Sequence, residues 1–193
     1  VTDTKRGVKR CIWHPKQKPV TAILDPILTL GLPKNLTAWT GCDALVHALE
    51  ALSVPQWHPL CDGLALQSIR MISKNLPAVV KNGSDLKARG AMLVASCLAG
   101  ISFLKGLGLV HAMSHMIGAV CNTHHGLTNA ILLPIVLKYN EKGLGNKTNL
   151  ICQSFDLKTH DFGNLYEAIV SLLDEIAIPN NLASLNVREN QVS

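Results

Sequence analysis

Aromatic residues are scarce in this chain, and charged residues are few in its middle. Phe, Trp and Tyr make up only 4% of the 193 residues, whereas nucleic-acid-binding surfaces commonly interleave aromatics with clustered Lys and Arg. The net charge of +5 reflects basic residues concentrated early in the chain, between Lys5 and Lys18. These two features argue against a nucleic-acid partner.

The chain also lacks a Cys-x-x-Cys pair and a signal sequence. Its six cysteines are widely scattered, which predicts reduced, packed thiols in the cytoplasm rather than a disulfide framework or a zinc knuckle. No apolar core follows the charges of the N-terminal VTDTKRGVKR, so no signal peptide is expected. The apolar run Ala91–Leu104 is shorter than the about 20 residues that span a bilayer. We expect a buried helix there and no membrane partner.

Hydrophobic residues form 48% of the chain, which is enough for one domain with a core. Two short β-prone runs, Val8–Trp13 and Val20–Leu24, come first and are predicted to be strands. From Pro33 onward the apolar spacing is helical, and Gly and Pro separate the segments. This pattern predicts a mainly α, bundle-like domain with Ser84 and Asn164 as N-caps. The expected helices are Gly41–Leu52, Pro59–Leu76, Ser84–Leu104, Leu109–Val120, Gly126–Tyr139 and Asn164–Ile176.

One long segment, Gly106–Leu137, contains no Asp, Glu, Lys or Arg, yet it carries four of the eight histidines. A stretch of this length without charge is expected to lie mostly inside the protein. Buried imidazoles need hydrogen-bonding or metal partners. A metal ion is one partner that would satisfy several of them at once.

Carboxylate and imidazole side chains recur at helical spacing in two places. Asp43 and His47 are four residues apart, so they project from one face of a predicted helix, and His111 and His115 repeat this spacing. Either pair by itself is more often an ordinary pair of core or surface side chains than a pair of metal ligands. The pair His124–His125 stands where a loop enters the next helix. A carboxylate, two imidazoles from different helices and a third from this loop would make a mixed oxygen and nitrogen shell suited to Fe(II), Zn, Mn or Co. Water or substrate would complete the coordination.

Two longer motifs resemble those of the iron-containing alcohol dehydrogenases. The first is DPILTLGLP at 25–33 followed by TGCDALVHALE at 40–50. The second is GLGLVHAMSH at 106–115, continuing through NTHHG at 122–126 to NAILLP at 129–134. The resemblance implies the C-terminal helical domain of that family, which has a dehydroquinate-synthase-like fold. It implies that residues 1–25 are a two-strand remnant of an α/β nucleotide-binding domain, and that the helical domain at 26–193 is truncated at its C-terminus.

The resemblance also implies roles for single residues. His115 matches a histidine near the reacting end of the cofactor, so it is either a catalytic proton relay or packing support for His111. Lys9 matches a position that approaches the dinucleotide, although a strand lysine is commonly a plain surface residue. His124 stands where relatives often have proline and is not expected to coordinate metal. The implied metal ligands are Asp43, His47, His111 and His125.

The implied activity is that of an oxidoreductase, in which the metal polarises the oxygen of a small alcohol or aldehyde while hydride passes to or from NAD or NADP. Fe(II) is the expected metal, with Zn as the alternative. No Gly-rich pyrophosphate turn is present, since Gly106–His111 begins like G-x-G-x-x-G but ends in His and follows a helix. We therefore expect a partial enzyme with little or no turnover by itself.

Two other interpretations stay open. Zinc-type polyol dehydrogenases and dehydroquinate-synthase-like proteins have a similar fold, although His111 and His125 in the second motif favour the iron-type branch. The alternative from another class is a non-catalytic metal-binding helical protein or an inactive fragment; storage proteins would favour a carboxylate-rich shell. The sequence does not determine the substrate, the choice between NAD and NADP, or whether the chain forms a homo-oligomer.

Overall fold

The computed structural model describes residues 2–3, 5–6, 8–9, 14–17 and 19–191, and these are mainly helical. The longer helices are α1 (Lys34–Ser53), α2 (Pro59–Lys81), α3 (Leu86–Ser102), α4 (Leu109–Cys121), α5 (His125–Leu144), α6 (Lys147–Ser154) and α7 (Phe162–Glu175). The short elements are the strands β1 (Thr2–Asp3) and β2 (Val8–Lys9) and the 3-10 helices η1 (Pro15–Gln17), η2 (Pro26–Thr29), η3 (Phe103–Lys105), η4 (Leu182–Leu185) and η5 (Glu189–Gln191).

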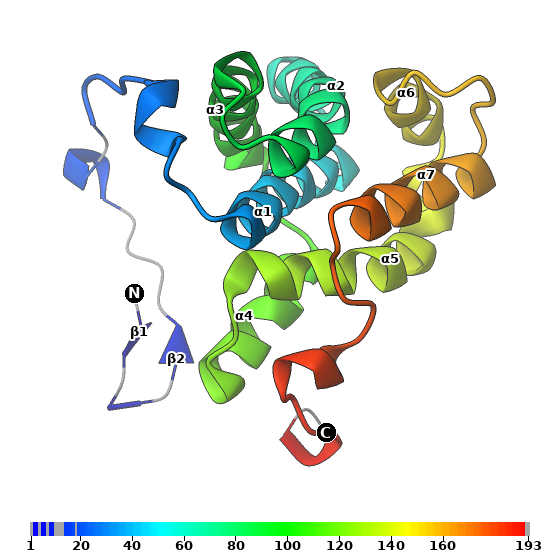
Figure 1. Cartoon of the computed structure of the whole chain (residues 1–193). Coiled ribbons are helices and arrows are strands. Elements are labelled where there is room, and N and C mark those ends of the chain that lie inside the picture. Colours follow the sequence, from blue (N-terminus) through cyan, green and yellow to red (C-terminus); the bar gives the residue numbers. More distant parts are fainter. Residues whose placement is uncertain (1, 4, 7, 10–13, 18, 192–193) are drawn as a thin grey trace.

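Helix α1 lies at the centre of the helical domain (Figure 1). It packs against α2 and α3 on one side and against α5 on the other, and α4 in turn packs against α5. Because α1 has neighbours on both sides, it is buried nearly all round, and Leu45, Val46 and Leu52 are at most 1% exposed. A polar side chain on α1 is therefore either a partner of another helix or part of a site.

The predicted helices all exist, but α1, α2 and α5 are clearly longer than expected and α6 was not predicted. α1 begins at Lys34 rather than Gly41, although Thr37 and Thr40 are weak helix formers. Their hydroxyls donate to the carbonyl oxygens of Leu32 and Leu36, and Thr37 is buried. Tertiary packing therefore extends this helix beyond what local propensity supports.

The predicted N-caps of α3 and α7 are wrong. Asp85, not Ser84, caps α3 by accepting from the backbone N–H of Ala88, with an N–O distance of 2.9 Å. Asp161, not Asn164, caps α7 by accepting from the Asn164 N–H at 2.9 Å. In both cases a carboxylate faces the positive end of the helix, which favours it over the neighbouring neutral side chain.

The prediction of two strands left over from a nucleotide-binding domain is not supported. Residues 20–24 form no strand, and Val20 and Ile23 are 103% and 85% exposed. Within Val8–Trp13, only Val8–Lys9 is described as a strand, since residues 10–13 lie outside the described part, and it pairs with Thr2–Asp3 in an antiparallel ladder. β-prone residues need a neighbouring strand to pair with, and the described residues offer none to 20–24.

The structure agrees with the expectation of free thiols for the described cysteines, of which three are buried and two are half-buried. Cys42, Cys61, Cys97, Cys121 and Cys152 are free, whereas Cys11 lies outside the described residues. Burial raises the pKa of the Cys42 thiol, and the neighbouring Asp43 carboxylate raises it further. This thiol therefore stays protonated at neutral pH.

The stretch Leu86–Lys105, formed by α3 and η3, has the length and composition of a membrane span, and 28% of its apolar part is buried inside the domain. It is longer than the run Ala91–Leu104 that the sequence suggests. Length and composition alone are weak evidence for a membrane span, because core helices of globular proteins have the same length and composition. In this structure α3 packs against α1 and α2.

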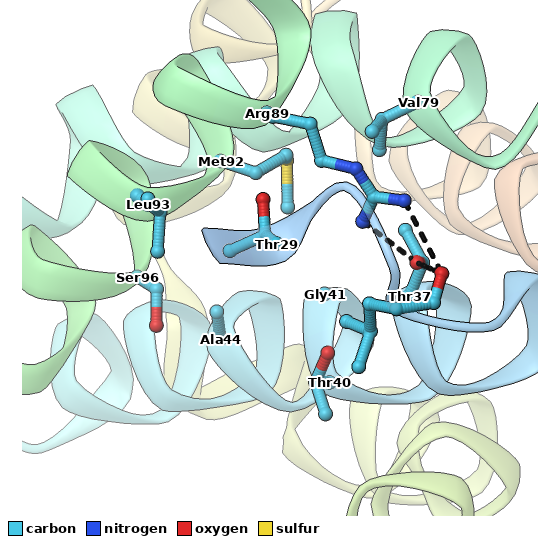
Figure 2. Close-up of a pocket in the computed structure, with 11 residues that line it drawn as sticks. Thr29, Thr37, Thr40, Gly41, Ala44, Val79, Arg89, Met92, Leu93 and Ser96 are labelled. Atoms are coloured by element: carbon cyan, nitrogen blue, oxygen red, sulfur yellow. Dashed lines mark hydrogen bonds between the residues drawn. The ribbon is translucent and has the colours of Figure 1, made fainter. Parts of the chain in front are cut away.

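Arg89 of α3 connects three segments on one side of α1. Its Nε donates to the carbonyl oxygen of Gly83 at 2.9 Å, Nη1 to Thr37 Oγ1 at 2.8 Å, and Nη2 to the carbonyl oxygen of Leu32 at 3.3 Å. The residue is 4% exposed and lines a cavity of about 120 Å³ that contains none of the candidate metal ligands (Figure 2). This arginine has a structural role in the fold.

Arg89→Met is expected to lower the free energy of unfolding by about 3 kcal/mol, because Met has a similar length but donates no hydrogen bond: the Gly83 carbonyl oxygen and Thr37 Oγ1 lose the Arg89 donor, and the Leu32 carbonyl oxygen keeps only the Thr37 hydroxyl. Urea unfolding followed by circular dichroism measures the change. Arg70→Met on the exposed side of α2 is the matched control and should change stability by less than about 0.5 kcal/mol. Equal losses in the two variants would contradict the bridging role of Arg89.

Candidate metal centre

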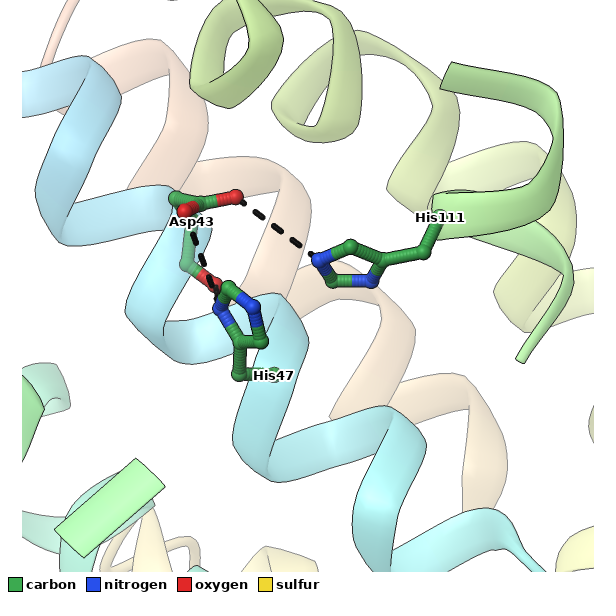
Figure 3. Close-up of side chains that lie close together, drawn as sticks. All are labelled: Asp43, His47 and His111. Atoms are coloured by element: carbon green, nitrogen blue, oxygen red, sulfur yellow. Dashed lines mark hydrogen bonds and ion pairs between the residues drawn. The ribbon is translucent and has the colours of Figure 1, made fainter. Parts of the chain in front are cut away.

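Three helices bring the predicted metal ligands together. Asp43 and His47 lie one turn apart on α1, His111 lies on α4, and His125 is the first residue of α5. Asp43 Oδ1 is 3.9 Å from His111 Nε2 and 3.4 Å from His125 Nε2. Figure 3 shows the His111 ring reaching across from α4 towards Asp43. Residues far apart in the sequence thus form one polar cluster within an apolar domain.

The spacing within the cluster suits a single ion. One donor atom from each of Asp43, His47 and His111 lies within 4.8 Å of the others. His125 adjoins this trio through Asp43, and its ring centroid is 5.3 Å from that of His111. One ion could therefore contact the Asp43 carboxylate and the imidazoles of His47 and His111, with His125 beside Asp43.

Hydrogen bonds fix the tautomers of two of these histidines. His47 Nδ1 lies 2.8 Å from the carbonyl oxygen of Asp43, and His111 Nδ1 lies 2.7 Å from Glu50 Oε2. A carbonyl or carboxylate oxygen only accepts, so each Nδ1 carries a proton, and in the neutral ring Nε2 then keeps its lone pair. His125 Nδ1 lies 3.1 Å from the hydroxyl of Ser114. Such partners on the remote nitrogen are typical of histidines that bind metals.

Two imidazoles of the cluster, those of His47 and His125, have pKa values below the ordinary histidine value. Burial lowers the pKa of His125 to about 4, against the opposing effect of the Asp43 carboxylate. Burial likewise lowers the pKa of His47, and His111 lowers it further while Asp43 raises it. Burial alone would raise the pKa of Glu50, but hydrogen bonds from His111, Gly108 and Val110 outweigh it and leave this pKa below its ordinary value. At pH 7 the lone pairs of His47 and His125 are therefore available to a cation.

Asn129 is a member of the cluster to which the sequence assigned no role. Its Nδ2 lies 2.6 Å from Asp43 Oδ1, 3.2 Å from His111 Nε2 and 3.1 Å from His125 Nε2. Its Oδ1 is buried and has no hydrogen-bond partner among the described residues. One signal was available: Asn129 follows His125 by four residues and so shares its helix face.

Gly126 allows α5 to approach α1 closely enough to bring His125 beside Asp43. A Cβ atom at position 126 would lie 2.5 Å from the carbonyl oxygen of Trp39 and 3.2 Å from Asp43 Cβ. A real Cβ atom does not come this close to the Trp39 carbonyl oxygen, and the backbone of α1 can move aside only at a large cost in packing free energy. Glycine at this position is therefore a condition for the geometry of the cluster.

The remaining predicted site residues lie around the cluster. The His115 ring meets His111 edge-on and is 5.1 Å, centroid to centroid, from the His125 ring. Lys9 lies in β2, which is next to α4 (Figure 1), and its side chain is outside the described part. His124 is exposed and caps α5 through the backbone N–H of Leu127. This capping contact fits the expectation that His124 is not a ligand.

A family model described as the C-terminal part of the Fe-containing alcohol dehydrogenase family matches residues 37–193. The chain belongs to the iron-containing alcohol dehydrogenase family. It is 41% identical over 186 residues to the probable alcohol dehydrogenase EutG of Escherichia coli (strain K12), covering 96% of this chain and 47% of that protein. It is 36% identical over 202 residues to the NAD-dependent methanol dehydrogenase of Bacillus methanolicus, covering 100% of this chain and 52% of that protein.

The helical fold is shared with solved members of the family. The crystal structure of a 1,3-propanediol oxidoreductase superimposes with a TM-score of 0.82 at 42% identity, covering 86% of this chain and 45% of that chain. The chain thus spans about half the length of the relatives that it matches. The mainly helical architecture expected from the sequence is that of the C-terminal half of an iron-containing alcohol dehydrogenase.

Proposed function

We propose that this chain is the metal-binding half of an alcohol dehydrogenase that uses Fe(II) and NAD or NADP to interconvert small alcohols and aldehydes. The observation that carries the proposal is the convergence of one carboxylate and three imidazoles from α1, α4 and α5. The names of the relatives support the reaction class, and the family name supports iron over zinc.

The donor set fits a divalent transition ion. Imidazole and carboxylate donors suit Fe(II), and His47 and His111 each present an unprotonated Nε2. The proposed ligands are Asp43, His47, His111 and His125. An ion held by these four residues would supply Lewis-acid polarisation of the substrate oxygen.

The residues of the chain itself would prepare this chemistry. Asp43 would offset part of the ion's charge, and the neutral histidines would leave a net positive centre that attracts an oxygen ligand. We further propose that His115, beside His125, relays or orients a proton, and that Lys9 approaches the dinucleotide. The proposed domain boundary follows residue 25, and the reduced thiols support a cytoplasmic location.

Metal binding by the chain tests the proposal. Anaerobically purified protein is expected to contain about one iron per chain by elemental analysis, because one donor atom from each of Asp43, His47 and His111 lies within 4.8 Å of the others and His125 Nε2 lies 3.4 Å from Asp43 Oδ1. Added Fe²⁺ at 100 times its dissociation constant should raise the free energy of unfolding by about 2.7 kcal/mol relative to the chelator-treated chain. A chain that binds no divalent metal would contradict the proposal.

A complementation assay separates the enzyme from the non-catalytic alternative. The chain alone is expected to show little turnover of 1,3-propanediol with NAD. Co-expression with the N-terminal half of EutG is expected to restore measurable oxidation, and the same pair with a chelator is the control. Metal binding without any restored turnover would instead favour a non-catalytic metal-binding protein.

A further inference from the structure

Glu50 is a buried carboxylate next to the candidate metal centre, and the predicted ligand set does not include it. It lies on α1 about one turn beyond His47, and the residue is 4% exposed. A carboxylate inside a protein is costly unless several donors surround it. The partners of Glu50 therefore indicate its role.

The described partners of Glu50 all belong to the start of α4. Oε2 accepts from the backbone N–H of Gly108 at 3.0 Å and from that of His111 at 3.3 Å, and Oε1 accepts from Val110 N–H at 2.6 Å. Gly108 is the N-cap of α4 and has no side chain that could cap the helix. Glu50 thus caps α4 from another helix and meets its positive end.

Gly108 leaves space for the Glu50 carboxylate because it has no Cβ atom. A Cβ atom on Gly108 would lie 2.8 Å from Glu50 Oε1 and 3.1 Å from Glu50 Cδ. Its backbone dihedral angles, φ −118° and ψ −152°, are open to other residues. Space for the carboxylate, rather than backbone freedom, is therefore the reason for glycine here.

The fourth contact joins Glu50 to a proposed ligand. Glu50 Oε2 lies 2.7 Å from His111 Nδ1, while His111 Nε2 faces Asp43 Oδ1 at 3.9 Å. We propose that Glu50 is a positioning residue of the metal centre, which keeps the His111 proton on Nδ1 and fixes α4 so that Nε2 faces the other ligands. The consequence for metal affinity rests on the proposed function, whereas the choice of tautomer does not.

Glu50→Gln tests this role with little change in shape. The amide keeps one acceptor oxygen, so its N–H₂ group faces either Val110 N–H or His111 Nδ1. In the second orientation His111 Nδ1 loses its acceptor, and the proton can move to Nε2, where it blocks coordination. In ¹⁵N spectra of the metal-free chain we expect His111 to be an Nδ1–H tautomer in the wild type and to gain an Nε2–H population in Glu50→Gln. The affinity for Zn²⁺, a redox-inert probe, is expected to fall about 10- to 100-fold.

Glu141→Gln, the same chemical change at an exposed position of α5, is the control. It should change neither the His111 tautomer nor the affinity for Zn²⁺. Gly108→Ala is the second variant, because it displaces the carboxylate without removing it and keeps the chain folded if Glu50→Gln does not fold. It is expected to shift the same tautomer and to weaken Zn²⁺ binding by about 10-fold.

An unchanged His111 tautomer in the folded variants, with Zn²⁺ affinity within about twofold of the wild type, would overturn the inference. The two proposals fail separately in this design. If the wild type binds no Zn²⁺ or Fe²⁺, the proposed function fails, while the tautomer of the metal-free chain still decides the role of Glu50.

Discussion

Asp43→Ala is expected to lower the affinity of the chain for Fe²⁺ or Zn²⁺ by more than about 100-fold, and His111→Ala is expected to do the same. Loss of a mere outer partner of a metal ligand already costs about 10- to 100-fold, and these two residues would contact the ion directly. Asp43 is central, because its Oδ1 lies within 4 Å of the Nε2 atoms of both His111 and His125. Titration calorimetry on chelator-treated protein measures the loss.

His160→Ala is the matched control for the histidine variant. His160 is exposed, and its Nε2 lies 3.0 Å from the carbonyl oxygen of Leu157, away from the cluster. Its substitution should leave metal affinity unchanged. If Asp43→Ala and His111→Ala both kept wild-type affinity while remaining folded, the metal would have to bind elsewhere on the chain.

Gly126→Ala is expected to lower the free energy of unfolding by about 2–3 kcal/mol and to weaken metal binding together with it. The added methyl group would meet the Trp39 carbonyl oxygen at 2.5 Å, so α5 must move away from α1. That movement carries His125 away from Asp43, since His125 is the neighbouring residue. Chemical unfolding and Zn²⁺ titration of the same variant measure the two effects.

Gly143→Ala in the same helix is the control, because a Cβ atom there would meet nothing within 4 Å. Alanine is the better helix former, so this variant should gain up to about 1 kcal/mol. A loss of stability in Gly143→Ala as large as that in Gly126→Ala would show that glycine is needed in α5 for some reason other than close packing on α1.

The cluster explains why a long uncharged segment carries histidines. Its apolar residues place α4 and α5 against α1, and its histidines meet the carboxylates of α1 within that apolar surrounding. Desolvation between the helices keeps the pKa values of His47 and His125 below the ordinary histidine value. Both the position and the protonation state of these imidazoles therefore follow from burial in one interface.

By itself, the sequence predicted the helical class and the approximate helix positions, and it singled out Asp43, His47, His111 and His125, which the structure brings together. These features depend on spacing within helices and on recognisable motifs. The sequence misplaced two N-caps and predicted a strand at Val20–Leu24, since a cap depends on which carboxylate reaches the N–H groups and a strand depends on a partner. Only the tertiary structure decided the partners of Glu50, Asn129 and Arg89 and the need for glycine at position 126. The physical reason is that most of these contacts join residues tens of positions apart, so they depend on how the helices pack against one another. Residue spacing along one helix does not specify that packing.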